Sequence, residues 1–285
     1  MAISTLKIKK FDINSMCKNP TIIINAKRGS GKSIAIRQLI NHFNVVEHYR
    51  VGVLCSRSEK VDPFYGNFFP DSYIYDDCAI AMEKVLRRQR RLISKNKQRK
   101  EKHLKLLDTR LLLVLDDVVA NAKEWNKSED MKEVMFNGRH YDITFIIAVQ
   151  DTVALPPASR NNFDYVFLFN NDITSEIQKI YQHFAGIFDC ANSFREVLAQ
   201  VTENYGILVI IRREAKSNKL EDKIAVFKAD ITLKPSMFGC DKFKKLHSRY
   251  YDKNWMGHED ETRDKYGMIG KNKNKHPVRV ELGVK

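Results

Sequence analysis

Residues 21–33 read TIIINAKRGSGKS, and this stretch decides the fold. Residues 21–25 are uncharged and rich in β-branched side chains, a pattern typical of a strand buried on both faces of a parallel sheet. A loop with Gly29 and Gly31 follows. Because glycine tolerates conformations that a side chain forbids, successive N–H groups in this loop can turn toward one anion. The stretch therefore predicts a strand, a phosphate-binding loop and the start of a helix.

Apolar side chains recur at helical spacing after the loop, in IAIRQLINHF at residues 34–43. The positive N-terminal end of this predicted helix would face the anion. Lys32 is expected to place its charge on the β and γ phosphates of ATP, and Ser33 to offer its hydroxyl to Mg²⁺. We expect the nucleotide to be held by eight consecutive residues, Ala26, Lys27, Arg28, Gly29, Ser30, Gly31, Lys32 and Ser33.

Ala26 stands where the motif GxxxxGK[ST] has its first glycine, the position at which the motif is most tolerant. A chance Gly-Lys-Ser turn before a surface helix is the alternative interpretation. The order of strand, loop and helix favours the phosphate-binding loop.

The bulk composition narrows the class of partner. The chain has 285 residues, a formal net charge of +14 and a pI near 9.5, which favour a polyanion such as nucleic acid or an anionic membrane surface. The N-terminus lacks the apolar region of a signal peptide, and no apolar run is long enough to span a membrane, so we expect a soluble protein. Its five cysteines form no C-x-x-C pair, which argues against zinc and against a disulfide framework.

Three regions are expected: an N-terminal arm or edge strand at 1–20, a core at 21–232 and a basic C-terminal tail at 233–285. The tail is interpreted either as a disordered solubilising segment or as a contact for DNA or the capsid. Within the core, residues 49–55 and 72–77 are strand candidates, and the loop between them carries four aromatic residues. Packing of these aromatics onto the body is favoured over base stacking or a subunit contact.

A long helical pattern at residues 79–107 forms a basic insertion, whose last 22 residues carry ten Lys or Arg against Glu101 alone. A solvated helix face or a flexible insertion would explain any single charge. The charge density favours contact with a nucleic-acid backbone for the stretch as a whole.

Two aspartates follow the apolar run LLLVL at 111–115, which is typical of the Walker B strand. Asp116 is expected to hold magnesium, and Asp117 to polarise the attacking water, although its side chain is shorter than the glutamate common at this place. An aspartate pair that caps a strand turn is the alternative. The next buried strand, 143–149, ends at Gln150, whose carboxamide could contact both the γ-phosphate and the water.

Arg139 precedes that strand, and Arg160 precedes a fifth strand at 164–169. Two helices, at about 173–185 and 190–203, and an antiparallel hairpin of residues 205–211 and 224–229 would complete an α/β fold with a mostly parallel sheet. The polar groups at the ends of successive strands then lie in one row at the carboxyl ends of the strands, where such sheets bind ligands.

Four blocks resemble the genome-packaging ATPases of large DNA viruses, the poxvirus and giant-virus branch of the FtsK–HerA superfamily of P-loop NTPases. They are INAKRGSGKS, LLVLDDVV, NGRHYDITFIIAVQ and LPPASRNNFDYVFLF. The resemblance implies a RecA-like core that works as a homo-oligomeric ring, a pentamer or hexamer, and pulls double-stranded DNA into a capsid. It also implies an arginine that reaches the neighbouring subunit's nucleotide, for which Arg139 is the first candidate and Arg160 the second.

The sequence thus favours an ATP- and magnesium-dependent motor that acts in the virion and at the viral assembly site in the host cytoplasm, beside a capsid or portal component. A nucleoside or nucleotide kinase is a second hypothesis, which the strand-end aspartates and Gln150 disfavour. A third is a virion structural protein that is associated with DNA and binds nucleotide without hydrolysing it.

Overall fold

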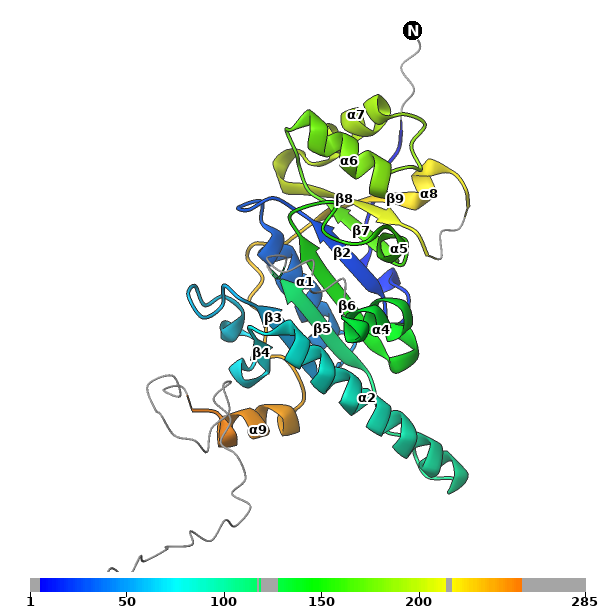
Figure 1. Ribbon diagram of the computed structural model, residues 1–285. Coiled ribbons are helices and arrows are strands. Elements are labelled where there is room, and N and C mark those ends of the chain that lie inside the picture. The colour runs from blue at the N-terminus through cyan, green and yellow to red at the C-terminus, as the bar shows by residue number, and fades with distance from the viewer. Residues whose placement is uncertain (1–5, 117, 119–127, 214–216, 253–285) are drawn as a thin grey trace, which may run out of the picture.

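The structure is a computed structural model that describes residues 6–116, 118, 128–213 and 217–252 (Figure 1). The described strands form one nine-stranded sheet in the order β1-β9-β8-β7-β2-β6-β5-β3-β4. The strands are β1 Lys9–Lys10, β2 Thr21–Asn25, β3 Gly52–Ser56, β4 Ile74–Tyr75, β5 Leu111–Asp116, β6 Ile143–Val149, β7 Tyr165–Leu168, β8 Gly206–Ile211 and β9 Ile224–Lys228. The helices are α1 Lys32–Val45, α2 Cys78–Glu101, α4 Glu129–Asn137, α5 Pro157–Arg160, α6 Thr174–Phe184, α7 Ala191–Val201, α8 Leu220–Lys223 and α9 Asp241–Tyr250.

The predicted α/β fold with a mostly parallel sheet is confirmed. The five strands β7, β2, β6, β5 and β3 run parallel, and every residue in them is buried. Continuous apolar strands are stable here because helices or aromatic loops cover both faces. The strand β6 lies between β2 and β5, and the three strands are parallel. The loop after β2 and the C-terminal ends of β6 and β5 therefore lie side by side.

Helices lie against the sheet (Figure 1), and a hydrophobic cluster packs on each of its two faces. On one face, α2, α4, α6 and α7 pack on alternate residues of the strands. The other face is covered by α1, by Phe11 of the N-terminal segment, by the aromatics of residues 64–69, and by Phe238 and Phe243. Tyr65, Phe68 and Phe69 are buried, so these three aromatics of the loop pack onto the body as expected.

Both predicted flanking features of the sheet are present. The N-terminal arm adds a short edge strand, since β1 pairs with β9 in parallel. The strands β8 and β9 form the expected antiparallel hairpin, which joins the central sheet through the antiparallel pair of β7 and β8.

The basic segment is a helix that projects from the body (Figure 1). Asp77 caps its first turn by accepting hydrogen bonds from the N–H groups of Ala79 and Ile80. The last buried residue of α2 is Gln89, and the helix ends at Glu101 rather than at 107. The twelve residues after Gln89 extend about 18 Å beyond the body, at 1.5 Å per residue. We call residues 90–107 the basic arm.

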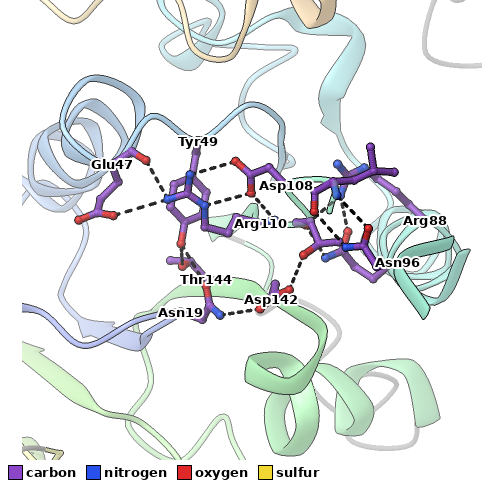
Figure 2. Close-up of polar contacts among 12 residues, drawn as sticks. Asn19, Glu47, Tyr49, Arg88, Asn96, Asp108, Arg110, Asp142 and Thr144 are labelled. Atoms are coloured by element: carbon purple, nitrogen blue, oxygen red, sulfur yellow. Dashed lines mark hydrogen bonds and ion pairs between the residues drawn. The ribbon is translucent and has the colours of Figure 1, made fainter. Parts of the chain in front are cut away.

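A polar network ties the base of the basic arm to the N-terminal ends of the strands (Figure 2). The Gln89 side chain donates to the carbonyl oxygens of Thr109 and Tyr141. Nearby, the hydroxyl of Tyr49 hydrogen-bonds the Thr144 hydroxyl at 2.7 Å, and burial raises the pKa of Tyr49 to about 12. Polar bonds therefore hold the sheet together where these strands begin. The phosphate-binding loop lies at the opposite, C-terminal ends of the strands.

The first part of the predicted tail is packed on the core. Phe238 is fully buried and stacks on Phe69 with ring centroids 4.8 Å apart, and the ring of Phe243 stacks on Tyr73 at 3.9 Å. Residues 241–250 form the helix α9, which the sequence did not predict because basic residues dominate its composition. The remainder of the tail, from residue 253, lies outside the described residues. Among the described helices, none is long and apolar enough to cross a membrane.

Candidate nucleotide-binding site

The loop between β2 and α1 has the geometry of an anion cradle. Gly29 and Gly31 have φ angles of 75° and 90°, in the left-handed region that favours glycine. Gly31 is the N-cap of α1, and no side chain hydrogen-bonds the cap position. The first N–H groups of α1 are thus available to an anion, which the helix dipole also favours.

The loop does not need the positive φ of a glycine at Ala26. Its N–H donates to the carbonyl oxygen of Val149 at 3.1 Å, which continues the ladder between β2 and β6. The backbone of Ala26 does not adopt a positive φ. The departure from the common motif is therefore compatible with the loop's conformation.

Lys32 and Asp116 form a buried ion pair at the centre of the site. The ammonium nitrogen of Lys32 lies 2.6 Å from Oδ1 of Asp116, and the two side chains are 10% and 4% exposed. The phosphate-binding loop and the end of β5 thus meet as the sequence predicted. A buried charge needs a partner, so each group neutralises the other until phosphate or a cation can replace it.

Tyr65 is a residue of the site for which the sequence predicted only loop packing. Its hydroxyl donates a hydrogen bond of 2.6 Å to Oδ2 of Asp116. Burial, together with the charge of Asp116 and its hydrogen bond, raises the pKa of Tyr65 well above its usual value, while a hydrogen bond with the Ser33 side chain acts in the opposite direction. Tyr65 therefore stays protonated and acts as a donor. Its sequence signal was only its place among four loop aromatics.

The oxygens of Ser33 and Asp116 suit a magnesium ion. Asp116 accepts a hydrogen bond from the Tyr65 hydroxyl, and Ser33 is near enough to that hydroxyl to lower the pKa of Tyr65, so both side chains lie on the same side of the site. Magnesium prefers hard oxygen ligands and completes its shell with water and substrate phosphates, so two protein oxygens are sufficient. Within the described part of the chain, no group of three or more His, Cys, Asp or Glu side chains forms a separate metal site.

Gln150 and Arg139 lie at opposite ends of the strand β6. Gln150 follows β6 directly, between the phosphate-binding loop and the end of β5, and is exposed. Asp117 lies outside the described residues. Arg139 is exposed in a 3₁₀ turn, Gly138–Tyr141, at the opposite edge, where β6 begins.

Arg160 is held inside its own chain. It is 6% exposed, its Nε donates to the carbonyl oxygen of Leu155 at 2.7 Å, and one of its terminal nitrogens lies 2.6 Å from Nδ1 of His183. The structure therefore brings together Lys32, Ser33 and Asp116, and Gln150 lies at the C-terminal ends of the same group of strands. Both candidate arginines lie away from this group.

Comparisons with known proteins identify the family to which the chain belongs. A family described as Poxvirus A32 protein matches residues 8–219. The "Uncharacterized protein L437" of Acanthamoeba polyphaga mimivirus is 34% identical over 291 residues, which cover 99% of this chain and 98% of the relative. The "Uncharacterized protein 088R" of Invertebrate iridescent virus 3 is 27% identical over 256 residues, with 85% and 93% covered.

The fold is shared with the genome packaging NTPase B204 of Sulfolobus turreted icosahedral virus 2, solved in complex with AMPPCP. The TM-score is 0.51 at 16% identity, with 75% of this chain and 99% of that chain covered. At this identity the likeness concerns the fold. Together with the family match, it confirms the resemblance that the four sequence blocks suggested. The chain is therefore an ATPase with a phosphate-binding loop and belongs to the poxvirus A32 protein family.

Proposed function

We propose that this ATPase is a double-stranded DNA translocase that packages a viral genome into a capsid and works as an oligomeric ring. The observation that carries the proposal is the pairing of Lys32 with Asp116 at 2.6 Å, at the edge where Gln150 also lies. A phosphate-binding lysine, a strand-end carboxylate and a carboxamide on the intervening strand are the groups that ATP hydrolysis needs.

Catalysis in this site would consist of positioning and charge neutralisation. Lys32 would leave Asp116 for the β and γ phosphates when ATP binds. Ser33 and Asp116 would hold Mg²⁺, which when bound supplies positive charge to the phosphate oxygens. Asp117 would polarise the attacking water, and Gln150 would contact the water and the γ-phosphate.

The DNA contact is assigned to the basic arm. Seven of its Lys and Arg side chains are exposed: Arg90, Arg91, Lys95, Lys97, Lys100, Lys102 and Lys105. The exposed Arg87 precedes the arm on the same helix. The Asn96 side chain donates to the carbonyl oxygen of Leu107 and accepts from its N–H, and these two bonds hold the chain after α2 against the helix. An ordered, positively charged projection is suited to phosphate contacts without base specificity.

The ring would place an arginine of one subunit on the nucleotide of the next. Arg139 is preferred, because its side chain is exposed, whereas Arg160 would first have to break its contacts with Leu155 and His183. An arginine supplied in this way increases turnover by about a thousandfold or more. Hydrolysis would therefore depend on assembly.

The setting is proposed to be the virion and the viral assembly site in the host cytoplasm, with a capsid or portal component as partner. The relatives from a mimivirus and an iridescent virus, which match most of the chain, support a viral role.

The decisive experiment is ATP hydrolysis by the purified chain with and without linear double-stranded DNA. A motor should release ADP and phosphate faster when DNA is present. A kinase would instead transfer the γ-phosphate to an added nucleoside or nucleotide, and a structural protein would bind ATP without turnover. Asp117→Asn serves as the control, because it should keep ATP bound and stop hydrolysis; normal turnover in this variant would contradict its assigned role.

A further inference from the structure

We propose that Tyr65 is a positioning residue for the metal site, whose hydroxyl fixes the orientation of the Asp116 carboxylate for magnesium. This inference rests on the proposed role of Asp116 in holding the ion. It adds a residue from outside the four blocks that resemble packaging ATPases, namely one from the loop between β3 and β4.

The two oxygens of Asp116 have different partners. Oδ1 lies 2.6 Å from the Lys32 ammonium nitrogen, and Oδ2 accepts the Tyr65 hydrogen bond at 2.6 Å. When Lys32 turns to the phosphates, its oxygen becomes available to the cation. Tyr65 can keep its bond to Oδ2 throughout, so the carboxylate retains one fixed contact while the other changes.

The backbone around Tyr65 is built to hold this side chain still. The carboxylate of Glu59, 9% exposed, accepts hydrogen bonds from the N–H groups of Phe64, Tyr65 and Gly66 at 2.7 to 3.1 Å. The carbonyl oxygen of Tyr65 accepts from the N–H of Phe68 at 2.9 Å. A buried carboxylate that caps a short turn in this way makes charge-assisted bonds, which are the stronger kind.

Neighbouring rings fix the tyrosine ring as well. Phe64 and Phe68 both pack edge to face with Tyr65, at centroid distances of 5.0 and 5.9 Å. Tyr65 itself is only 2% exposed. A phenylalanine would fill the same space with the same ring contacts and would lack only the donor. The hydroxyl, rather than the ring, is therefore the group that acts on Asp116.

Groups that orient a metal ligand change metal affinity by about 10- to 100-fold when they are removed. The full-length Tyr65→Phe chain should therefore bind Mn²⁺, used as a probe for Mg²⁺, about 10- to 100-fold more weakly in the presence of a non-hydrolysable ATP analogue. Electron paramagnetic resonance of free Mn²⁺ measures this affinity directly. Binding of the same analogue in EDTA should stay within about twofold of the wild type, because the phosphate-binding loop is unchanged.

Tyr49→Phe is the matched control. It also removes a buried tyrosine hydroxyl, the one bonded to Thr144 at 2.7 Å, but at the opposite edge of the sheet. It should change neither the Mn²⁺ affinity nor the analogue affinity in EDTA. Wild-type Mn²⁺ affinity in Tyr65→Phe would overturn the proposal, and so would an equal loss of both affinities in Tyr65→Phe, which would indicate a purely structural role.

A third variant separates this proposal from the function on which it rests. If Asp116→Asn loses Mn²⁺ affinity and Tyr65→Phe does not, Asp116 is a metal ligand and the proposal for Tyr65 alone is wrong. If Asp116→Asn also binds Mn²⁺ like the wild type, the assignment of the metal site itself is wrong. If Asp116→Asn and Tyr65→Phe both lose Mn²⁺ affinity and Tyr49→Phe does not, the metal site and the role of Tyr65 are both supported.

Discussion

The ammonium group of Lys32 and the carboxylate of Asp116 neutralise each other inside the protein, at a distance of 2.6 Å. Lys32→Ala would leave the buried Asp116 carboxylate without its countercharge, which typically costs about 3–5 kcal/mol of unfolding free energy. Lys32→Ala/Asp116→Asn should recover much of this loss, because the second change removes the stranded charge. Urea denaturation without nucleotide measures both variants.

Arg28→Ala, in the same loop but exposed, is the control and should change the unfolding free energy by less than about 0.5 kcal/mol. Equal destabilisation by Lys32→Ala and by the double substitution would contradict the ion pair as a stabilising contact.

The packing of Phe238 predicts where the folded ATPase core ends. Its ring is fully buried against Phe69, so Phe238→Ala should lower the unfolding free energy by about 3–5 kcal/mol. Leu246→Ala, at a residue of α9 that is 45% exposed, should have little effect. Urea denaturation of both variants tests whether residues 233–252 belong to the core. A small effect of Phe238→Ala would indicate that the segment is a dispensable attachment.

Local sequence patterns predicted the elements that carry the nucleotide. The strands β2, β5 and β6 are mainly apolar runs: β2 and β5 end in the polar residues Asn25 and Asp116, and Gln150 follows β6 directly. Such runs can be buried on both faces, so a parallel sheet was predictable from the sequence. The phosphate-binding loop followed from the positions of Gly29 and Gly31, which require a positive φ in the structure.

Contacts between distant segments were not predictable in the same way. Tyr65 reaches Asp116 across 51 residues of sequence, and its contact depends on the path of a loop that Glu59 organises through backbone bonds. Phe238 lies in a segment whose basic composition resembles a tail, yet one ring buried against Phe69 fixes it to the sheet. The apolar pattern of a single aromatic is too short to distinguish an anchor from a linker.

The basic arm predicts a strong salt dependence of DNA binding. The substitutions R90Q, R91Q, K95Q and K97Q together should weaken binding to double-stranded DNA of any sequence. They should also reduce the slope of log K against log[salt] by roughly one for each phosphate that the arm no longer neutralises. Fluorescence anisotropy at several salt concentrations measures both quantities. The matched control K132Q, K179Q, K219Q and K228Q removes the same number of charges elsewhere and should leave the slope nearly unchanged. Equal effects of the two sets would exclude the basic arm as the specific footprint.

The two arginine candidates predict different results when subunits are mixed. Arg139→Ala subunits and Lys32→Ala/Asp116→Asn subunits should each be inactive, and their mixture should regain part of the DNA-stimulated hydrolysis. The reason is that some interfaces would pair an intact nucleotide site with an intact Arg139. A mixture with Gln150→Ala in place of Arg139→Ala should regain nothing, because Gln150 would act within its own subunit.

If Arg160 is the residue that acts across the interface, Arg160→Ala should complement the site-defective subunit and Arg139→Ala should not. If none of these mixtures regains ATP hydrolysis although mixed assemblies demonstrably form, the nucleotide site is not shared between subunits.

Displacement of a third strand from linear double-stranded DNA tests translocation most directly. A fluorescent triplex-forming oligonucleotide is bound at a site far from the end at which the protein loads, and its release is followed after ATP is added. The account predicts ATP-dependent release by the wild type, and no release with a non-hydrolysable ATP analogue or by Lys32→Ala/Asp116→Asn. Continued ATP hydrolysis by DNA-bound protein without release of the third strand would contradict the proposal that this chain moves along DNA.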